Sequence, residues 1–162
     1  MIRYANAGDV CALHALLVQV NRIHHNGRPD LFKPNPKYTE AELLEILEDE
    51  DRPILVYTDE QDRVCGYAFC MLRQEKESRL LTDVKTLYLD DLCVDERMRG
   101  KHIGKALYDG VVALAREKGC YNLTLNVWAC NPNAIAFYRA CGMQVQKLGM
   151  ETILGGEDDA KA

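Results

Sequence analysis

The sequence predicts an α/β (α+β) fold: a mixed, mostly antiparallel central sheet of six to seven strands, flanked by about four helices. Strand-like and helix-like segments alternate along the chain, which favours one sheet with helices on its faces. The chain has 162 residues, so we expect one domain at residues 1–154, followed by a flexible polar tail at 155–162. It is 48% hydrophobic and 28% charged, the composition of a globular protein whose core needs neither disulfides nor metals.

The beginning of the chain predicts one short strand and two helices. Ile2 to Ala5 forms the strand, and apolar residues at every third or fourth position predict a helix over about residues 9–25. Residues 24–38 are rich in Pro, Gly and Asn, which indicates a loop. Thr39 begins a Thr-x-x-Glu capping box, and this motif predicts a second helix over about residues 40–49.

The middle of the chain predicts three strands and the longest helix. Residues 54–58 and 64–73 are separated by a polar turn and form a hairpin, and residues 86–94 are the next strand. A helix then runs to about Lys118 before Gly119, a residue type that often ends helices. Its apolar stripe consists of Ile103, Leu107, Val111 and Leu114.

The last part of the chain predicts three strands and one helix. Residues 123–127 are apolar or β-branched and predict a short strand. Asn131 precedes a proline, the pattern of an N-cap with proline at the first helical position, and this helix ends at Gly142. Residues 143–146 and 150–154 predict two short strands that complete the sheet.

The composition argues against several classes of protein. The net charge of -5 disfavours nucleic-acid binding, which needs a basic surface. The seven cysteines are widely spaced without a CxxC, so we expect no disulfide framework and no metal site, and most should be buried as small apolar residues. The sequence shows neither a signal peptide nor an apolar stretch of bilayer length, which leads us to expect a cytoplasmic protein without membrane contacts.

The segment Arg99-Gly100-Lys101-His102-Ile103-Gly104-Lys105 has the features of a phosphate-binding loop. It lies before the long helix, where free N–H groups and the positive end of the helix dipole attract an anion. Its spacing is not that of a P-loop, because only three residues separate the glycines and Ala106 stands where Ser or Thr would bind magnesium. A dinucleotide-binding G-x-G-x-x-G is also absent. An ordinary turn with solvated cations is the alternative interpretation.

Three motifs between residues 87 and 154 resemble the GNAT superfamily of N-acetyltransferases. The strand Leu89-Asp90-Asp91-Leu92-Cys93-Val94 is similar to the fourth strand of that family. Arg99-x-x-His102-x-Gly104 is similar to the signature [RQ]-x-x-G-x-[GA], with His102 in place of the usual first glycine. Asn131-x-x-Ala134-x-x-Phe137-Tyr138, followed by Gly142, is similar to N-x-x-A-x-x-F-Y-x-x-x-G. The N-terminal half agrees only in element order.

This resemblance implies acetyl-CoA as co-substrate, no metal, and a sheet that splays between strands 4 and 5. The phase of apolar residues changes along the fourth strand, so an extra residue among Asp90 and Asp91 would form a bulge. Beyond the bulge, the backbone would bind pantetheine, and the segment from Arg99 to Lys105 would bind the pyrophosphate. The implied pantetheine contacts are Leu92, Cys93 and Val94, and the implied contacts from the last helix are Asn131, Ala134 and Tyr138.

The resemblance also implies that Tyr138 is the general acid. A phenol with a pKa of about 10 can protonate the departing thiolate, although Tyr138 as part of the helix core is the alternative. The general base would be Asp90 or Asp91, because consecutive strand residues point to opposite faces and one would face the acceptor. The alternative is that both carboxylates only cap the bulge. Glu151 is a less supported candidate for the base.

Several residues are candidates for the acceptor pocket. His24, His25 and Arg28 lie near the end of the first helix, in a region that contributes to this pocket in the family. Alternatively, the histidines stabilise the helix C-terminus through positive charge. Trp128 and Tyr88 either line the pocket or only pack.

We therefore expect an enzyme that transfers an acetyl group from acetyl-CoA to a primary amine by direct attack in a ternary complex. The acceptor would be a small amine, polyamine, amino acid or peptide, or a protein N-terminus or lysine, and the Asp90-Asp91 pair favours a cationic small molecule. The alternatives are a non-catalytic acyl-CoA-binding regulatory module and a nucleotide enzyme. The family resemblance is also compatible with a homodimer.

Overall fold

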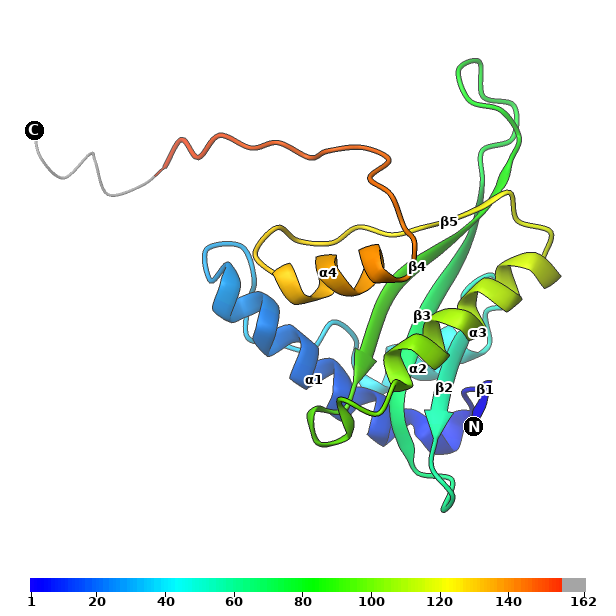
Figure 1. The fold of residues 1–162 in the computed structure, drawn as a ribbon, viewed down its shortest axis with the longest axis vertical. Coiled ribbons are helices and arrows are strands. Elements are labelled where there is room, and N and C mark those ends of the chain that lie inside the picture. Colours follow the sequence, from blue (N-terminus) through cyan, green and yellow to red (C-terminus); the bar gives the residue numbers. More distant parts are fainter. Residues whose placement is uncertain (156–162) are drawn as a thin grey trace, which may run out of the picture.

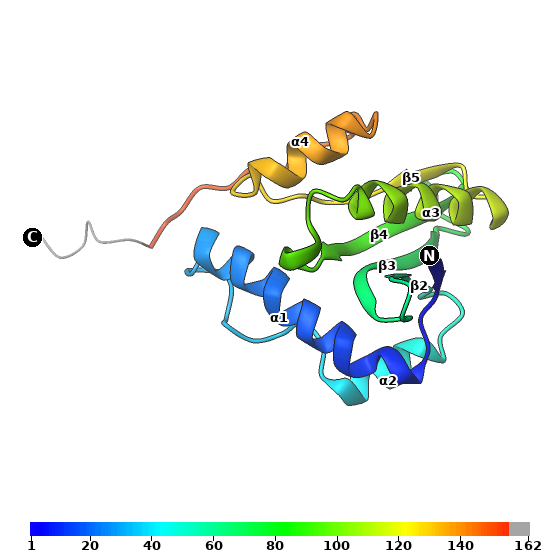
Figure 2. The same ribbon diagram turned by 60° about the horizontal axis from the view of Figure 1, so that its bottom comes forward.

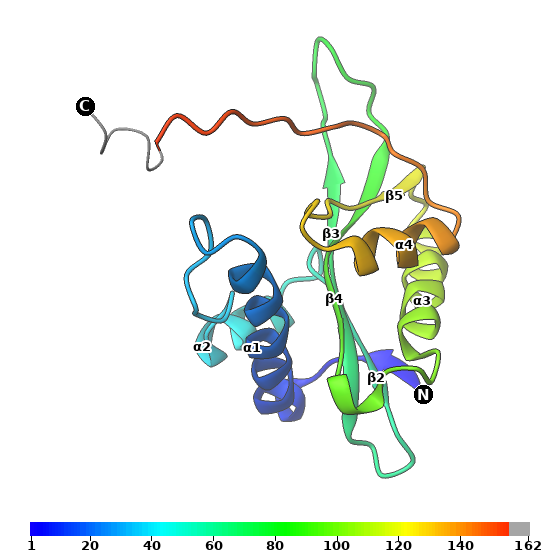
Figure 3. The ribbon, with the colours of Figure 1, turned by 60° about the vertical axis from the view of Figure 1, so that its left-hand side comes forward.

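In the part of the chain that the structure describes, a five-stranded sheet lies between two layers of helices (Figures 1 and 3). The structure is a computed structural model that describes residues 1–155. The strand order is β1-β2-β3-β4-β5, with antiparallel pairing throughout except between β4 and β5, which are parallel. The strands are β1 (Ile2–Tyr4), β2 (Ile54–Thr58), β3 (Val64–Gln74), β4 (Lys85–Val94) and β5 (Asn122–Thr124).

Within residues 1–155, four α-helices cover the two faces of this sheet. In Figure 2, α1 and α2 lie on one side, and α3 and α4 lie on the other. The helices are α1 (Val10–Gly27), α2 (Glu40–Leu47), α3 (Ile103–Glu117) and α4 (Pro132–Ala140), with short 3-10 turns at Ala7–Asp9 and Glu96–Met98. None of the helices in residues 1–155 combines the length and the apolar character needed to cross a bilayer.

The predicted helix ends are confirmed where a local motif defines them. Thr39 and Glu42 form the reciprocal capping box: the Thr39 N–H donates to Glu42 Oε2 at 2.7 Å, and the Glu42 N–H donates to Thr39 Oγ1 at 3.2 Å. The side chain of Asn131 accepts from the Ala134 N–H at 3.2 Å at the start of α4. Gly119 follows α3 with a φ of 68°, a conformation that glycine adopts without strain.

The predicted number of six to seven strands is wrong. Residues 143–146 and 150–154 form no strand, and the predicted strand 123–127 is limited to Asn122–Thr124. The physical reason is that a strand needs a hydrogen-bonded neighbour, and the sheet in residues 1–155 ends at β5, whose only partner is β4. Of the tail predicted at 155–162, residues 156–162 lie outside the described part of the chain.

The sheet separates two hydrophobic clusters, because alternate strand residues point to opposite faces. On the α1 and α2 face, Tyr67 and Phe69 of β3 pack with residues of both helices. On the α3 face, Leu87 and Leu89 of β4 pack with the apolar stripe of α3. β4 therefore contributes to both cores and lies between the two helical layers.

The predicted bulge in β4 is confirmed. Phe69 of β3 pairs with Asp91, but the next residue, Cys70, pairs with Leu89, so Asp90 is the extra residue. β4 pairs with β5 only from Thr86 to Tyr88, and its second half has no β5 partner. The two strands therefore separate after Tyr88, just before the bulge, and residues 89–94 of β4 have no β5 residue beside them.

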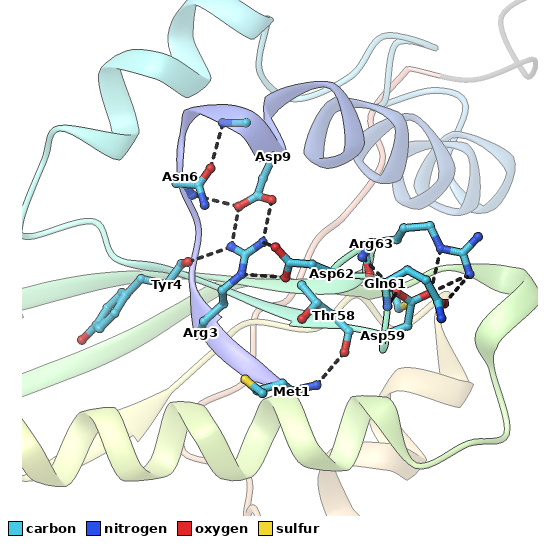
Figure 4. A network of polar contacts seen from close by, with 12 residues as sticks. Met1, Arg3, Tyr4, Asn6, Asp9, Thr58, Asp59, Gln61, Asp62 and Arg63 are labelled. Carbon is cyan, nitrogen blue, oxygen red and sulfur yellow. Dashed lines mark hydrogen bonds and ion pairs between the residues drawn. The ribbon is translucent and has the colours of Figure 1, made fainter.

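A buried ion pair connects β1 to the start of α1 (Figure 4). The Arg3 guanidinium donates to both carboxylate oxygens of Asp9, at 2.7 and 3.0 Å, and also contacts Asp62 in the β2–β3 turn at 3.1 Å. Burial raises the pKa of Asp9, but the bonds from Arg3 and from the Asn6 N–H outweigh this effect, so the pKa lies below its ordinary value. Folding therefore favours the ionised carboxyl of Asp9.

Replacing Asp9 with Asn is expected to lower the free energy of unfolding by about 1–3 kcal/mol, because Arg3 then loses its buried partner. Since the pKa of Asp9 is lower in the folded state, its contribution is present above the ordinary carboxyl pKa near 4 and is lost as the pH falls below it. Urea unfolding at several pH values measures both effects. The matched control is Asp62→Asn at an exposed site, where a loss as large as that of Asp9→Asn would contradict the assignment.

Candidate functional site

A groove of about 480 Å³ lies between the β4–α3 connection and α4. Its walls combine apolar side chains with backbone and cationic groups from the α3 N-terminus. Seven of the residues predicted to bind the cofactor line this groove: Val94, Arg99, Gly100, His102, Ile103, Gly104 and Lys105. The groove thus brings together the end of the unpaired half of β4 and the predicted phosphate-binding segment.

Sequence analysis missed four residues of the groove wall: Met98, Phe137, Ala140 and Cys141. Phe137 and Ala140 lie on α4 and Cys141 is its C-cap residue, and their helical spacing places all three on one face of that helix. This spacing was visible in the sequence, but which face of α4 turns toward α3 depends on the packing of the two helices. Lys101, by contrast, was predicted in the site and does not line the groove; its Nζ lies 3.7 Å from Met98 Sδ.

The chain reaches the groove through two residues with positive φ. Asp95 begins the connection: its side chain accepts from the Arg97 N–H at 3.0 Å. Gly100 then has a φ of 79° and His102 a φ of 59°, which turn the chain into α3. His102 therefore has the left-handed conformation that a glycine adopts most easily, so its substitution for the family glycine leaves a glycine-like backbone.

The beginning of α3 presents free backbone donors to the groove. The first intrahelical bond runs from the Ala106 N–H to the His102 carbonyl at 3.0 Å, so the N–H groups of residues 103–105 precede it. At Gly104, an added Cβ would lie 3.5 Å from the Phe137 ring, an ordinary van der Waals contact, so the glycine leaves the space of one methyl group between the two helices. These donors, with the helix dipole, form a site for an anion.

One of the two basic side chains of the groove wall, Lys105, forms an ion pair within the chain. Lys105 Nζ contacts Asp109 Oδ2 at 2.6 Å, one turn along α3. Arg99 lies in the wall of the groove, on the other side of the glycine turn. An anion bound here would therefore meet the backbone amides of α3 and the guanidinium of Arg99, and it would compete with Asp109 for Lys105.

The strain at His102 leads to a prediction about two substitutions. The left-handed region costs an L-amino acid about 1–2 kcal/mol, and β-branched residues are the least tolerant of it. We expect His102→Val to lower the melting temperature by about 2–4 °C for each kcal/mol of added strain, and to weaken CoA binding. His102→Gly is expected to keep the melting temperature. Equal melting temperatures and CoA affinities for the Val and Gly variants would contradict this interpretation.

The two acidic residues of the bulge have different partners. Asp90 Oδ2 accepts from Lys37 Nζ at 2.6 Å and from the Tyr38 hydroxyl at 3.2 Å, both in the loop between α1 and α2. Asp91 Oδ2 accepts from the buried Tyr67 hydroxyl at 2.8 Å. Asp90 is therefore held in an ion pair, whereas the contact of Asp91 is with a neutral donor.

The carboxyl of Asp91 has a pKa well above the ordinary value of an aspartate. Burial raises the pKa of its carboxyl to about 6, and the charge of Asp90 acts in the same direction. The hydrogen bond from Tyr67 and the charge of Lys37 oppose this rise. A carboxyl with this pKa is ionised near neutral pH and still basic enough to accept a proton.

Tyr138 lies on α4 and packs against the hydrophobic cluster on the α3 face. Its ring centroid is 5.1 Å from that of Phe137 and 6.5 Å from that of Tyr108. Burial and the negative charge of Asp91 raise the pKa of its hydroxyl well above the ordinary value of a tyrosine. The phenol therefore keeps its proton at neutral pH.

The other residues predicted to bind the cofactor make contacts within the chain, either in the two hydrophobic clusters or in the cap of α4. The side chain of Cys93 is buried on the α1 face, 3.7 Å from the Leu16 carbonyl oxygen, so only its backbone faces the open side of β4. Leu92 packs against the cluster on the α3 face. The Asn131 side chain and the Ala134 N–H are joined in the cap of α4.

An aromatic cluster joins the end of α1, the loop after α1 and the loop before α4. His24 stacks on Phe32 with centroids 5.1 Å apart, and Phe32 meets Trp128 edge to face at 5.0 Å. Burial and the charge of Lys37 lower the pKa of His24, so the alternative that a positive charge on His24 stabilises the end of α1 is not supported. His25 Nδ1 lies 2.6 Å from the Phe32 carbonyl oxygen, and this contact fixes the loop.

Two further acceptor candidates are held by polar contacts. Arg28 bonds to Asp30 at 2.7 Å and to Glu151 at 3.2 Å, so Glu151 is engaged in an ion pair of its own. Tyr88 lies under the guanidinium of Arg73, 3.7 Å from the ring centroid. His24 and Trp128 are the candidates that lie in the aromatic cluster.

The described residues contain no group of three or more His, Cys, Asp or Glu side chains placed to hold a metal ion. The seven cysteines carry free thiols, but only Cys65, Cys70 and Cys93 are buried. The prediction that most cysteines are buried is therefore wrong. Cys11 and Cys130 are exposed because they lie on the outer side of α1 and in the loop before α4.

Comparisons with known proteins agree with this geometry. Residues 20–143 match the model of the acetyltransferase (GNAT) family. A 124-residue stretch is 28% identical to glucosamine 6-phosphate N-acetyltransferase 1 of Oryza sativa subsp. japonica and covers 74% of this chain and 72% of that protein. A 66-residue stretch is 32% identical to the Arabidopsis thaliana glucosamine 6-phosphate N-acetyltransferase, covering 41% of this chain but only 42% of that relative's length.

Two solved structures extend the similarity to the whole fold. A mutant of the BH1408 protein from Bacillus halodurans has a TM-score of 0.91 at 31% identity, over 95% of this chain and 99% of that one. An aminoglycoside N-acetyltransferase in complex with CoA has a TM-score of 0.71 at 15% identity, over 96% of this chain and all of that one (100%). The second likeness concerns the fold alone.

Proposed function

The chain belongs to the acetyltransferase (GNAT) family, and from this premise we propose that it transfers an acetyl group from acetyl-CoA to a primary amine. The observation that carries the proposal is the groove at the start of α3, which ends at the unpaired half of β4. Asp91 and Tyr138 lie on β4 and α4, the two elements that border this opening. The pKa of Asp91 is low enough for the carboxyl to be ionised at neutral pH, as a base requires, whereas the pKa of Tyr138 is high enough for the phenol to keep its proton, as an acid requires.

The groove has the chemistry that acetyl-CoA needs. The free amides of residues 103–105 and Arg99 suit the pyrophosphate, and the apolar side chains of Val94 and Phe137 suit the pantetheine arm. The half of β4 without a β5 partner offers backbone groups for the amides of that arm. When bound, acetyl-CoA supplies the activated acyl group, and the residues of the chain orient it and move protons.

Asp91 is the proposed general base, and the contacts of the two carboxylates support this choice over Asp90. A primary amine is mostly protonated at neutral pH and must lose a proton before its nitrogen attacks. Asp90 is held by Lys37 and Tyr38, whereas Asp91 has a pKa of about 6 and accepts from neutral donors, the Tyr67 hydroxyl and the backbone N–H of Leu92. Asp91 accepts the proton from the ammonium group, directly or through water.

Tyr138 is the proposed general acid. The amine nitrogen forms a bond to the thioester carbon, and the carbon–sulfur bond then breaks with its electron pair on sulfur. Tyr138 donates its phenolic proton to this sulfur, which leaves as a neutral thiol. The phenolate regains a proton from solvent as Asp91 releases one, so the net proton transfer is from the amine to the thiol.

The acceptor is proposed as an amine-bearing small molecule. The relatives at 28% and 32% identity are named for glucosamine 6-phosphate, and a relative from Bos taurus, 37% identical over 60 residues (37% of this chain and 35% of that protein), is named thialysine N-epsilon-acetyltransferase. The carboxylates of the bulge and the aromatic cluster of His24, Phe32 and Trp128 support a cationic acceptor. Amino sugars, thialysine and polyamines are therefore the first compounds to test.

A screen of acetyl-CoA turnover tests the proposed function. Free-thiol release is measured with each amine, and the acetylated product is identified by its mass. We expect release that depends on one class of acceptor. Tight CoA binding without turnover on amines, amino acids or peptides would instead favour a non-catalytic acyl-CoA-binding module.

A further inference from the structure

Lys37, in the loop between α1 and α2, holds its ammonium group at the bulge of β4. Its Nζ lies 2.6 Å from Asp90 Oδ2, and the side chain of Asp90 is only 10% exposed, whereas that of Lys37 is 44% exposed. Among residues 1–155, Lys37 is the lysine that forms an ion pair with a carboxylate of the bulge. The chain therefore places a primary amine of its own next to the residue that precedes the proposed base, Asp91.

The bulge lies along β4 from the groove, in the half of the strand that has no β5 partner. Val94 lines the groove, and Asp90 precedes it by four residues in β4. A strand rises about 3.3 Å per residue, so the bulge is about 13 Å from the groove along the unpaired edge. The pantetheine arm is an extended chain with two amides and a comparable length. With the pyrophosphate bound at residues 99–105, the acyl end of the arm is therefore expected at the bulge.

The charges of Lys37 and Asp91 act on the groups that surround the bulge. The charge of Lys37 lowers the pKa of Asp91, and it also lowers the pKa of His24 in the aromatic cluster. The charge of Asp91 in turn raises the pKa of Tyr138. The interaction of two charges weakens with the distance between them. The ammonium of Lys37 is therefore near the proposed base and the aromatic cluster, and the base is near the proposed acid.

We propose that Lys37 is a site of self-acetylation, which accepts the acetyl group within its own chain when no free amine occupies the acceptor side. The inference rests on the proposed function, because acetyl-CoA is the donor. The ammonium of Lys37 loses one proton to Asp91, and Nζ then bonds to the thioester carbon. The carbon–sulfur bond breaks with its electron pair on sulfur, which receives the proton of Tyr138. The nitrogen releases its second proton to water, so Lys37 ends as a neutral amide.

Acetylation of Lys37 would change the charge at the bulge. Asp90 would lose its ion-pair partner and keep the bond from the Tyr38 hydroxyl. The positive charge that lowers the pKa of Asp91 would also be absent, so this pKa would rise. The modified protein is therefore expected to need a higher pH for the ionisation of its base. Self-acetylation in the absence of an acceptor would thus alter the later activity of the same site.

Labelling of the whole protein without an added amine tests the modification. Protein whose Lys37 is unmodified by peptide mapping is incubated with acetyl-CoA that carries a carbon-13 acetyl group, and the labelled lysines are quantified by mass spectrometry. We expect Lys37 to be labelled at least about 100-fold faster than the exposed Lys76, the smaller gain that general acid–base catalysis provides. Excess CoA should abolish this difference, and the rate per chain should not depend on protein concentration.

Two variants and a parallel assay complete this experiment. Lys37→Arg should remove the fast label, whereas Lys33→Arg in the same loop is the matched control and should keep it. Labelling of Lys37 no faster than Lys76, or a rate per chain that rises with protein concentration, would overturn the proposal. Turnover of a free amine with Lys37 unlabelled would refute self-acetylation alone, whereas the absence of both reactions would refute the proposed function as well.

The pKa of Asp91 provides a second test, which needs no acetyl-CoA. Carbon-13 NMR of the aspartate carboxyl groups, recorded across a pH series, measures this pKa in the protein alone. Lys37→Gln has a neutral amide, as acetyl-lysine does, and is expected to raise the pKa of Asp91 above that of the parent. Lys37→Arg keeps the positive charge and is the matched control. The same pKa in the parent and the Gln variant would show that the ammonium of Lys37 does not act on the base, and would overturn the proposal.

Discussion

Tyr138→Phe is expected to lower kcat by about 100-fold, the lower end of the range for the loss of general acid catalysis. The substitution removes only the hydroxyl, so the ring still packs in the cluster on the α3 face. No described residue forms a hydrogen bond with this hydroxyl, so its removal leaves no buried group without a partner. Stopped-flow or steady-state thiol release measures kcat, and calorimetry with CoA is expected to show an unchanged Kd.

Tyr108 provides a matched control for this experiment. Its ring centroid lies 6.5 Å from that of Tyr138, and it is buried beside Phe137 of α4, so Tyr108→Phe makes the same chemical change nearby. We expect kcat of the Tyr108 variant to stay close to that of the parent. If both variants lose activity equally, the effect comes from packing; if neither does, Tyr138 has no part in proton transfer.

Asp91→Asn is expected to lower kcat/KM by about 100- to 10,000-fold, because the amine then lacks its base. The same variant should be more stable at neutral pH. Folding raises the pKa of Asp91 to about 6, so the folded protein binds this proton more tightly than the unfolded chain does. The stabilisation is complete below the ordinary carboxyl pKa near 4 and is lost as the pH rises through 6, and Asn avoids that loss.

The pH dependence of the parent enzyme is the second part of this test. Asp91 must be ionised to act as a base, so kcat/KM should rise with pH through an apparent pKa of about 6. Tyr67→Phe removes a hydrogen bond that stabilises the carboxylate, so this limb should move to higher pH. Asp90→Asn removes a neighbouring negative charge, so the limb should move to lower pH.

These opposite shifts distinguish a catalytic from a structural role for Asp91. A merely structural contact between Tyr67 and Asp91 would change stability without moving the pH profile. If Asp91→Asn retains its activity while Asp90→Asn loses it, the roles of the two carboxylates are reversed. Melting temperatures at pH 5 and pH 8 show whether the expected gain in stability is confined to the higher pH.

The sequence predicted most elements whose signals are local. The capping box at Thr39, the N-cap at Asn131 and the glycine after α3 each involve groups within a few residues of one another. The bulge at Asp90 was visible as a change of apolar phase within one strand. The two strands predicted after α4 are wrong, because an alternating or apolar pattern does not specify the neighbour to which a strand bonds.

The segment that the family resemblance predicts to bind the pyrophosphate lies, apart from Lys101, on the walls of one groove. The resemblance did not identify the face of α4 that contributes Phe137, Ala140 and the C-cap residue Cys141. The orientation of a helix about its axis is set by the side chains of the elements that pack against it. Here those elements are α3 and β4, which are distant in the chain.

The sequence by itself determined the helices, the first four strands, the bulge and the family to which the chain is similar. Only the tertiary structure distinguished the two carboxylates of the bulge, because their partners are remote: Lys37 is 53 residues from Asp90, and Tyr67 is 24 residues from Asp91. Acidity depends on burial and on charges brought near by folding. The hydrogen bonds of a helix turn or a cap join residues that are close in the sequence, so the sequence predicts them. The environment of a carboxyl group forms only when separate elements pack together.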